Sequence, residues 1–190
     1  QFFWHATNRR TDRWGGPALV ARARFGVEAV RACREACGPD FPIIFRFSQW
    51  KQQDYRAKLA ETPEELGTLL LALAEAGVDI FHASQRRFRE PAFVGSPLNL
   101  AGWARKLTGK PAISVGSVGI SRDMLETFAS SEAAGREDVG EAARRLAAGE
   151  FDLIAVGRAL IADPGWPEKI RRGDLEAIRP YSAQCLASLD

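Results

Sequence analysis

Four short apolar runs, each followed by a helical stretch, constrain the fold of this chain more than any other feature. The predicted strands span residues 43–48, 78–84, 112–115 and 151–156. They are nearly continuous in apolar residues, as in a parallel sheet covered by helices. The alternation predicts an α/β protein. No linker-like stretch divides residues 1–190, so we expect a single domain.

The clearest helix signal follows the first predicted strand. Thr62 suits the N-cap, Pro63 suits the first helical position, and Glu65 is expected to complete a capping box. Leucines recur at helical spacing after it, and Gly77 marks its end. Other segments are predicted as helices (17–37, 98–107, 140–148, 158–161 and from 163), as a polar loop (49–61) and as a less regular stretch (119–138).

The number of strand–helix units limits the architecture. A closed (β/α)8 barrel has eight strands and typically about 250 residues, whereas four units are predicted here. The chain is therefore a small open sheet or half of a barrel. It begins with Gln1 rather than Met and opens on no recognisable signal peptide, so we expect a cut N-terminus.

Composition excludes several classes of protein. The formal net charge is only +2, which argues against nucleic-acid binding. No apolar run approaches the roughly 18 residues of a membrane span, so a soluble protein is expected. Reduced cysteines and the lack of an export signal lead us to expect the cytoplasm. Three cysteines do not indicate a disulfide framework. Cys33 and Cys37 lie four apart on a predicted helix, and we expect them to face the core rather than bind a metal, because no ligand partner recurs nearby.

Two glycines that end the last two strands indicate a phosphate site. Gly116-Ser117 follows the third strand, and Gly157-Arg158 follows the fourth. In (β/α)8 barrels the loops after strands seven and eight often bind phosphate beside a short helix. Glycine lets backbone N–H groups approach phosphate oxygens, and arginine adds a charge-assisted contact. The alternative is two tight turns and a solvated arginine.

Arg46 interrupts an apolar strand. Arginine is rarely buried without a partner, and strand alternation points it away from the face of Phe45 and Phe47. We expect a buried guanidinium that faces an anionic or electron-rich group. From spacing alone, a flavin ring and a carboxylate on a neighbouring strand are equally consistent. His82, on the next strand, is expected to be a hydrogen-bonded core histidine.

These residues and three longer stretches resemble the NADH:flavin oxidoreductase, or old yellow enzyme, family. The stretches are residues 7–16 with the downstream Arg-Ala-Arg-Phe at 22–25, the strand containing 46–48, and the segments 115–119 and 156–164. The resemblance implies the C-terminal half of a (β/α)8 TIM barrel, about strands 5–8. Residues 17–20 depart from the sequence that many members carry there, which puts the subgroup in doubt.

The resemblance also implies a cofactor and the residues that bind it. The cofactor is FMN, reduced by NADH or NADPH. Arg46 is implied to contact the flavin ring near its N1/O2 edge and to stabilise the reduced, anionic form. Gly116, Ser117 and Gly157 are implied to offer backbone N–H groups to the FMN phosphate, with which Arg158 pairs.

The family's chemistry implies hydride transfer from the reduced flavin to an alkene activated by a carbonyl or nitro group. The groups that activate this small-molecule substrate are expected upstream, so we expect no catalytic residue within this chain and no activity of the isolated chain. Trp50 and Phe88 are predicted to line the substrate pocket.

Two other functions remain open. A non-catalytic half-barrel would bind a phosphorylated ligand or a partner chain, and its exposed sheet edges would favour self-association or pairing with the missing half-barrel. A phosphosugar enzyme would share only the late phosphate site. No convincing Lys or Glu base at a strand end favours the phosphosugar reaction.

Overall fold

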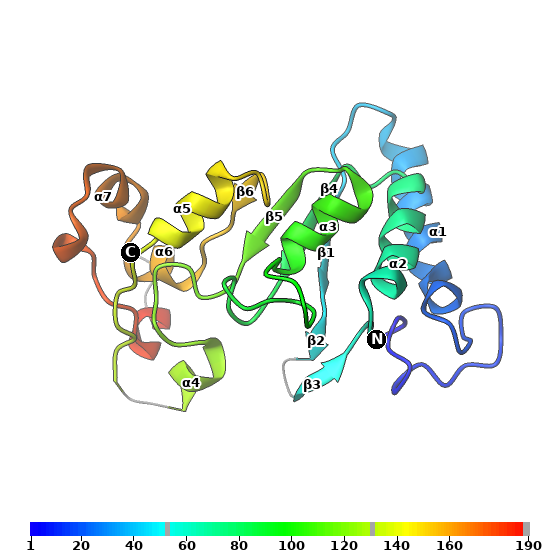
Figure 1. Cartoon of the computed structure of the whole chain (residues 1–190), viewed down its shortest axis with the longest axis horizontal. Helices are drawn as coiled ribbons and strands as arrows, with labels where there is room; N and C mark the ends of the chain where they lie inside the picture. The colour runs from blue at the N-terminus through cyan, green and yellow to red at the C-terminus, as the bar shows by residue number, and fades with distance from the viewer. Residues whose placement is uncertain (52–53, 130–131, 188–190) are drawn as a thin grey trace.

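The computed structural model describes residues 1–51, 54–129 and 132–187, in which strands and helices alternate (Figure 1). The elements in chain order are α1 (Leu19–Cys37), β1 (Ile44–Ser48), β2 (Trp50–Lys51), β3 (Asp54–Lys58), α2 (Pro63–Glu75), β4 (Ile80–Ser84), α3 (Leu100–Thr108), β5 (Ala112–Val115), α4 (Met124–Phe128), α5 (Gly140–Ala147), β6 (Leu153–Ile154), α6 (Arg158–Ala162) and α7 (Trp166–Arg172). Two short 3₁₀ helices, Leu175–Ala177 and Ala183–Leu186, follow α7.

The central sheet has four parallel strands in the order β1-β4-β5-β6. Each strand pairs with the next one of the sheet along the chain, and a helix intervenes at every crossover. The register sets Arg46 opposite His82 and Ser48 opposite Ser84. The predicted α/β fold with a parallel sheet is therefore confirmed.

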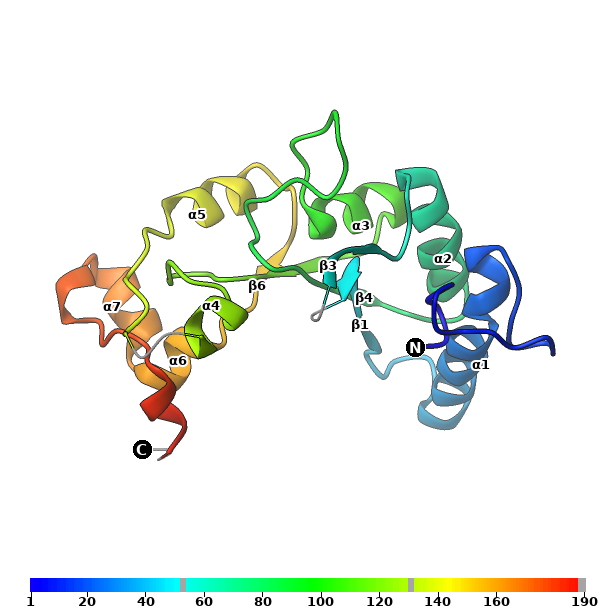
Figure 2. The same cartoon turned by 90° about the horizontal axis from the view of Figure 1, so that it is seen from below.

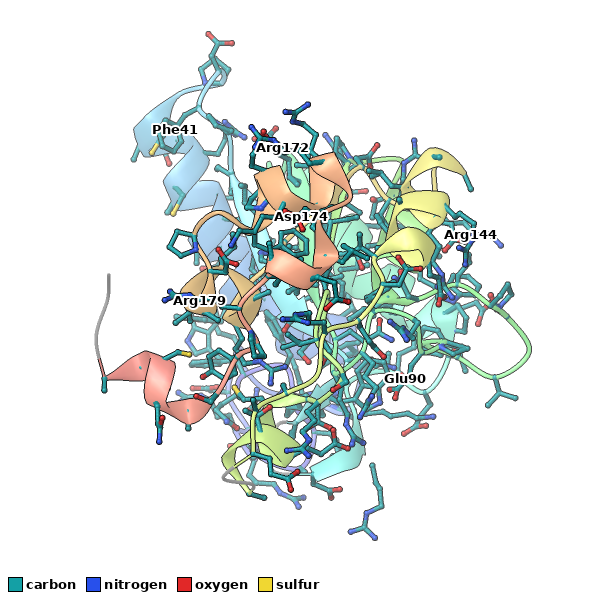
Figure 3. All side chains as sticks on the ribbon, turned by 90° about the vertical axis from the view of Figure 1, so that its left-hand side faces the viewer. Phe41, Glu90, Arg144, Arg172, Asp174 and Arg179 are labelled. Atoms are coloured by element: carbon teal, nitrogen blue, oxygen red, sulfur yellow. The ribbon has the colours of Figure 1, made fainter. Side chains whose placement is uncertain are left out.

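One face of the sheet packs against helices and forms the core. Figure 2 shows α2, α3 and α5 in an arc on this side of the strands. Phe47, Phe81 and Ala112 alternate onto it and are buried, together with four leucines of α2 (Leu66, Leu69, Leu70 and Leu73). Arginines Arg144 of α5 and Arg172 of α7 lie on the outer surface (Figure 3).

The opposite face is concave and much more exposed. Ile44 on β1 is 53% exposed and Leu153 on β6 is 52% exposed, while Ile80 and Ile113 between them are half-buried. Ile44 pairs with Ile80 where these strands begin, and Ile113 pairs with Leu153 two positions further along, level with His82. We call these four residues the aliphatic row. Arg46 shares this face, as alternation predicts, but it is exposed, so the expectation of a buried guanidinium is wrong for this chain.

The segment predicted as a polar loop after β1 is mostly an antiparallel hairpin. Trp50 of β2 pairs with Lys58 of β3. The buried Gln49 side chain holds its base, since the amide donates to the Ala60 carbonyl at 2.6 Å and accepts from the Ala60 N–H at 3.2 Å. The hairpin is rich in polar residues, so its sequence lacks the alternation of apolar and polar residues that predicts a strand. By contrast, β6 is shorter than the six residues predicted.

The capping box predicted at Thr62 and Glu65 is only half formed in the structure. The Thr62 hydroxyl accepts from the Glu65 N–H, but the Glu65 carboxylate accepts from the Glu61 N–H instead of the Thr62 N–H. A complete capping box lies in the stretch predicted to be irregular, where Asp123 and Glu126 begin α4.

Cys33 and Cys37 are both exposed, which overturns their predicted place in the core. The buried stripe of α1 continues from Val30 to Arg34, whose guanidinium bonds to the Gly77 carbonyl and to Asp79. Arg34 therefore occupies the inner side of the last turn. None of the helices in the described ranges is long and apolar enough to cross a membrane.

Arg22 fastens the N-terminal segment to α1. The side chain is buried, and its guanidinium donates to the backbone carbonyls of Phe3 at 2.7 Å, Gly16 at 3.2 Å and Pro17. The buried arginine thus satisfies three carbonyls of a segment that has no regular structure. Burial lowers the pKa of Arg22.

We predict that Arg22→Ala lowers the free energy of unfolding by about 2–4 kcal/mol, because it leaves carbonyls without donors and opens a cavity. Urea unfolding followed by circular dichroism measures the loss. Arg24→Ala is the control, since Arg24 is exposed two positions along the same helix, and its effect should stay within about 0.5 kcal/mol. Equal losses in the two variants would contradict the assigned role.

Candidate cofactor-binding site

The carboxyl ends of the parallel strands surround a cavity of about 430 Å³. Figure 1 shows the β2–β3 hairpin and α4 at this edge of the sheet. The residues around the cavity come from every strand of the central sheet or from the segment that follows it, and they include Arg46, Ser48, Trp50, Ser84, Arg86, Val115, Gly116, Ser117, Asp123, Met124, Gly157 and Arg158. The five predicted cofactor residues therefore line one cavity.

The turn after β5 is held in a conformation that requires glycine. Gly116 has a φ of +147°, and a Cβ there would lie 2.5 Å from the Gln85 carbonyl oxygen. Ser117 follows with a φ of +50°, which is uncommon for a residue other than glycine. Its hydroxyl donates to the Arg86 carbonyl at 3.1 Å. Successive backbone N–H groups in a turn can form the concave anion sites called nests.

The N–H groups of Gly116, Ser117 and Gly157 have no acceptor among the residues that the structure describes. Gly116 is buried, and a buried backbone donor is normally paired, whereas Ser117 is half-buried and Gly157 is exposed. A Cβ at Gly157 would meet no atom within 4 Å, so the space beside this glycine is open to a ligand. We call Gly116, Ser117 and Gly157 the N–H cradle. Its unpaired donors fit a phosphate group.

Arg158 is fixed beside the N–H cradle at the start of α6. Its guanidinium donates to the Arg122 carbonyl at 2.9 Å, the Asp123 carbonyl at 2.9 Å and the Thr127 hydroxyl at 2.6 Å. It also lies 3.4 Å from the Ser117 hydroxyl. These oxygens hold the guanidinium in place beside the cradle, where it can donate charge-assisted hydrogen bonds to an anion.

An ionic cluster supports the same edge of the cavity. The carboxylate of Asp123 lies 2.5 Å from Arg86, and Glu126 contacts Arg86 and Arg87 at 3.3 and 2.7 Å. Burial opposes ionisation of Asp123, but the N–H of Glu126 and the Arg86 guanidinium outweigh it, so its pKa lies below the ordinary value. The hydrogen bond from Arg86 to Asp123 raises the pKa of Arg86. Both groups remain charged at neutral pH.

Arg46 lies on the wall of the cavity next to β4. Its guanidinium is 3.3 Å from His82 Nε2 and donates to the Ser84 hydroxyl at 3.1 Å. Burial and the charge of Arg46 lower the pKa of His82, so the imidazole is neutral at pH 7 and its Nε2 accepts from Arg46. No carboxylate forms a salt bridge with Arg46 in the described part of the chain. Its charge is therefore directed into the cavity.

The two predicted substrate-pocket residues lie in different places. Trp50 is half-buried and lines the cavity. Phe88 is 1% exposed within a second core cluster that contains Tyr181 and Trp166, so it cannot contact a substrate in this structure. Phe88 does lie in the loop after β4, as predicted, but its side chain is buried in the core cluster and does not face the cavity. Its prediction as a pocket residue is wrong.

Sequence reasoning missed Arg86 and Asp123, which also line the cavity. A signal for Asp123 was present, because Asp123 and Glu126 have the spacing of a capping box. Arg86 had no comparable signal, since its partner is 37 residues away along the chain. Long-range ion pairs of this kind are not encoded in local patterns.

A parallel α/β sheet whose strand ends carry an N–H cradle and two arginines has the arrangement that α/β barrels often use to bind phosphate groups. The profile of the NADH:flavin oxidoreductase / NADH oxidase family matches residues 1–176. The chain therefore belongs to this family, which includes the old yellow enzymes and whose members are oxidoreductases that use FMN with NAD(P)H.

Known proteins agree with this membership. The chain is 33% identical over 187 residues to an NADH oxidase of Thermoanaerobacter brockii, covering 94% of this chain and 25% of the relative. It is 27% identical over 190 residues to a bilirubin reductase of Clostridium symbiosum, covering 94% and 45%. The solved structure of morphinone reductase in complex with tetrahydroNAD matches with 27% identity and a TM-score of 0.62, covering 90% of this chain and 39% of that one. The chain thus spans less than half of each.

We predict that Gly116→Ala destabilises the fold by at least about 2 kcal/mol, because its Cβ would collide with backbone and its φ is unfavourable for alanine. Gly157→Ala, whose Cβ meets open space, should cost less than half as much. Thermal unfolding of the two variants checks the difference. A larger loss for Gly157→Ala would contradict the geometry of the cradle.

We predict that His82 makes stability fall as the pH is lowered. Its folded pKa is depressed, so the unfolded state binds more protons, and the free energy of unfolding decreases once the pH falls through the unfolded value of about 6.5. Urea unfolding at pH 8, 6.5 and 5 measures this slope. His82→Gln should flatten it, whereas the same change at His5, which is exposed, serves as the control. An unchanged slope in His82→Gln would count against a depressed pKa.

Proposed function

We propose that this chain holds FMN in the cavity at the strand ends, with the phosphate at one side and the flavin ring at the other. The observation that supports the phosphate position is the N–H cradle, whose donors have no acceptor in the described residues and which lies beside Arg158. A dianionic phosphate supplies acceptors for all of them and a partner for the guanidinium.

Arg46 is the proposed contact of the flavin ring. It lines the same cavity as the cradle but projects from β1, whereas the cradle follows β5 and β6. A cation that is directed into the cavity favours negative charge on the pyrimidine edge of the ring. Neutral His82 and Ser84 orient this cation without neutralising it. The proposed effect is therefore electrostatic and works through a fixed guanidinium.

We further propose that β1, β4, β5 and β6 are strands 5–8 of a (β/α)8 barrel. The solved structures that resemble the chain are barrels of the old yellow enzyme family. The aliphatic row of Ile44, Ile80, Ile113 and Leu153 supports this, because side chains of this kind fill the interior of closed barrels. The unpaired outer edges of β1 and β6 fit pairing with a further half-barrel.

When bound, FMN supplies hydride transfer between NAD(P)H and an acceptor. We propose an activated alkene of the enone type as the acceptor, on the family resemblance. The residues of this chain bind and orient the cofactor, and Trp50 walls off part of the substrate space. No side chain here is assigned to donate the proton to the alkene, so we expect the chain by itself not to reduce enones.

We predict that the chain binds FMN at least about tenfold more tightly than riboflavin, which lacks the phosphate, because several charge-assisted hydrogen bonds are involved. Arg158→Gln should weaken FMN binding and leave riboflavin binding unchanged. Arg46→Gln should weaken both ligands, since both carry the same ring. Quenching of flavin fluorescence in titrations measures the dissociation constants.

Arg144→Gln is the control for these titrations, because Arg144 is exposed on the outer side of α5 (Figure 3). Equal affinity of the chain for FMN and riboflavin would contradict the proposed phosphate site. Loss of riboflavin binding in Arg158→Gln would show that this arginine supports the fold instead.

A further inference from the structure

A second cavity, of about 460 Å³, adjoins the cofactor cavity and shares Trp50 and Arg86 with it. One side is formed by the β2–β3 hairpin, which contributes Trp50 and Lys58. The other side is formed by the loop between β4 and α3, which contributes residues 90–96. Because two lining residues are common to both cavities, the two cavities are neighbours.

Part of the lining of this second cavity is apolar and part is charged. Ala92 and Phe93 are buried beneath its floor, and Pro91 and Trp50 also line it. The side chain of Val94, in the loop between β4 and α3, is apolar and 100% exposed. A cavity with this lining accepts an aromatic or aliphatic body.

Of the two cations that line the second cavity, Arg86 has carboxylate partners and Lys58 has none among the residues that the structure describes. Arg86 is compensated by Asp123 and Glu126, at 2.5 and 3.3 Å. Glu90 faces Arg87 at 3.7 Å. Lys58 has no salt bridge and no hydrogen bond from its side chain in the described part of the chain.

The register of the hairpin explains why Lys58 stays available. Lys58 pairs with Trp50 across the two strands, so the aromatic ring and the ammonium group share one cavity. Lys51, on the same hairpin, instead stacks over Trp4 at 5.1 Å and lines a different cavity. Only one of the two hairpin lysines is therefore directed to the second cavity.

We propose that the second cavity is a subsite for the carboxylate end of an apolar substrate, with Lys58 as the anion-binding residue and Trp50 as the wall for the substrate body. This inference rests on the proposed function, since the substrate's reacting end would lie in the cofactor cavity. Lys58 thereby determines specificity: it favours substrates with a carboxylate remote from the reacting carbon over their neutral counterparts.

The subsite can be tested without the cofactor. The probes are 3-phenylpropionate and its neutral amide, 3-phenylpropionamide, titrated into the FMN-free chain and followed by ligand-observed NMR. We expect the carboxylate to bind about fivefold more tightly, as for a charge-assisted hydrogen bond at a partly exposed site. Lys58→Gln should weaken binding of the carboxylate and leave binding of the amide unchanged, whereas Lys51→Gln should change neither.

Equal affinities of the two probes for the unmodified chain overturn the proposal. An equal loss in Lys51→Gln and Lys58→Gln also overturns it, because the preference would then reflect overall charge. The separate flavin titrations distinguish this failure from that of the proposed function. If the chain binds no FMN but still prefers the carboxylate in a Lys58-dependent way, the anion site is supported and only its relation to the cofactor is contradicted.

Discussion

The parallel direction of the four central strands is the constraint on which the candidate site depends. Parallel strands bring every carboxyl end to one edge, so residues from β1, β4, β5 and β6 converge although they are far apart along the chain. Arg46 and Arg158 are separated by 112 positions in the sequence yet line one cavity. An antiparallel arrangement of the same strands would have sent half of these groups to the opposite edge.

The two faces of the sheet divide the tasks of stability and binding. The helix-covered face carries the buried phenylalanines and leucines that form the core. The concave face carries the aliphatic row together with the polar groups Arg46, His82 and Ser84, and Ser84 lies at the carboxyl end of its strand. Membership in the NADH:flavin oxidoreductase family agrees with this division, because barrels of this type keep chemistry at the carboxyl ends of the strands.

Much of the fold and part of the site could be predicted from local patterns. The strand containing Arg46 and the turns at Gly116 and Gly157 were placed correctly because period, glycine and capping signals act within a few residues. The exposure of Arg46 and the burial of Phe88 could not be predicted in this way, since they depend on which distant elements pack against each residue. The β2–β3 hairpin was missed for a related reason: the bonds of Gln49 to Ala60 span eleven positions.

The anchoring of Arg158 has a consequence for the kinetics of recognition. An arginine that is free in solvent loses rotamer entropy when it closes on a ligand, and this loss weakens binding. Here three neutral oxygens immobilise the side chain as the protein folds. An anion that binds at the proposed phosphate site would therefore meet an arginine that is already ordered, and binding would need no rearrangement of this side chain.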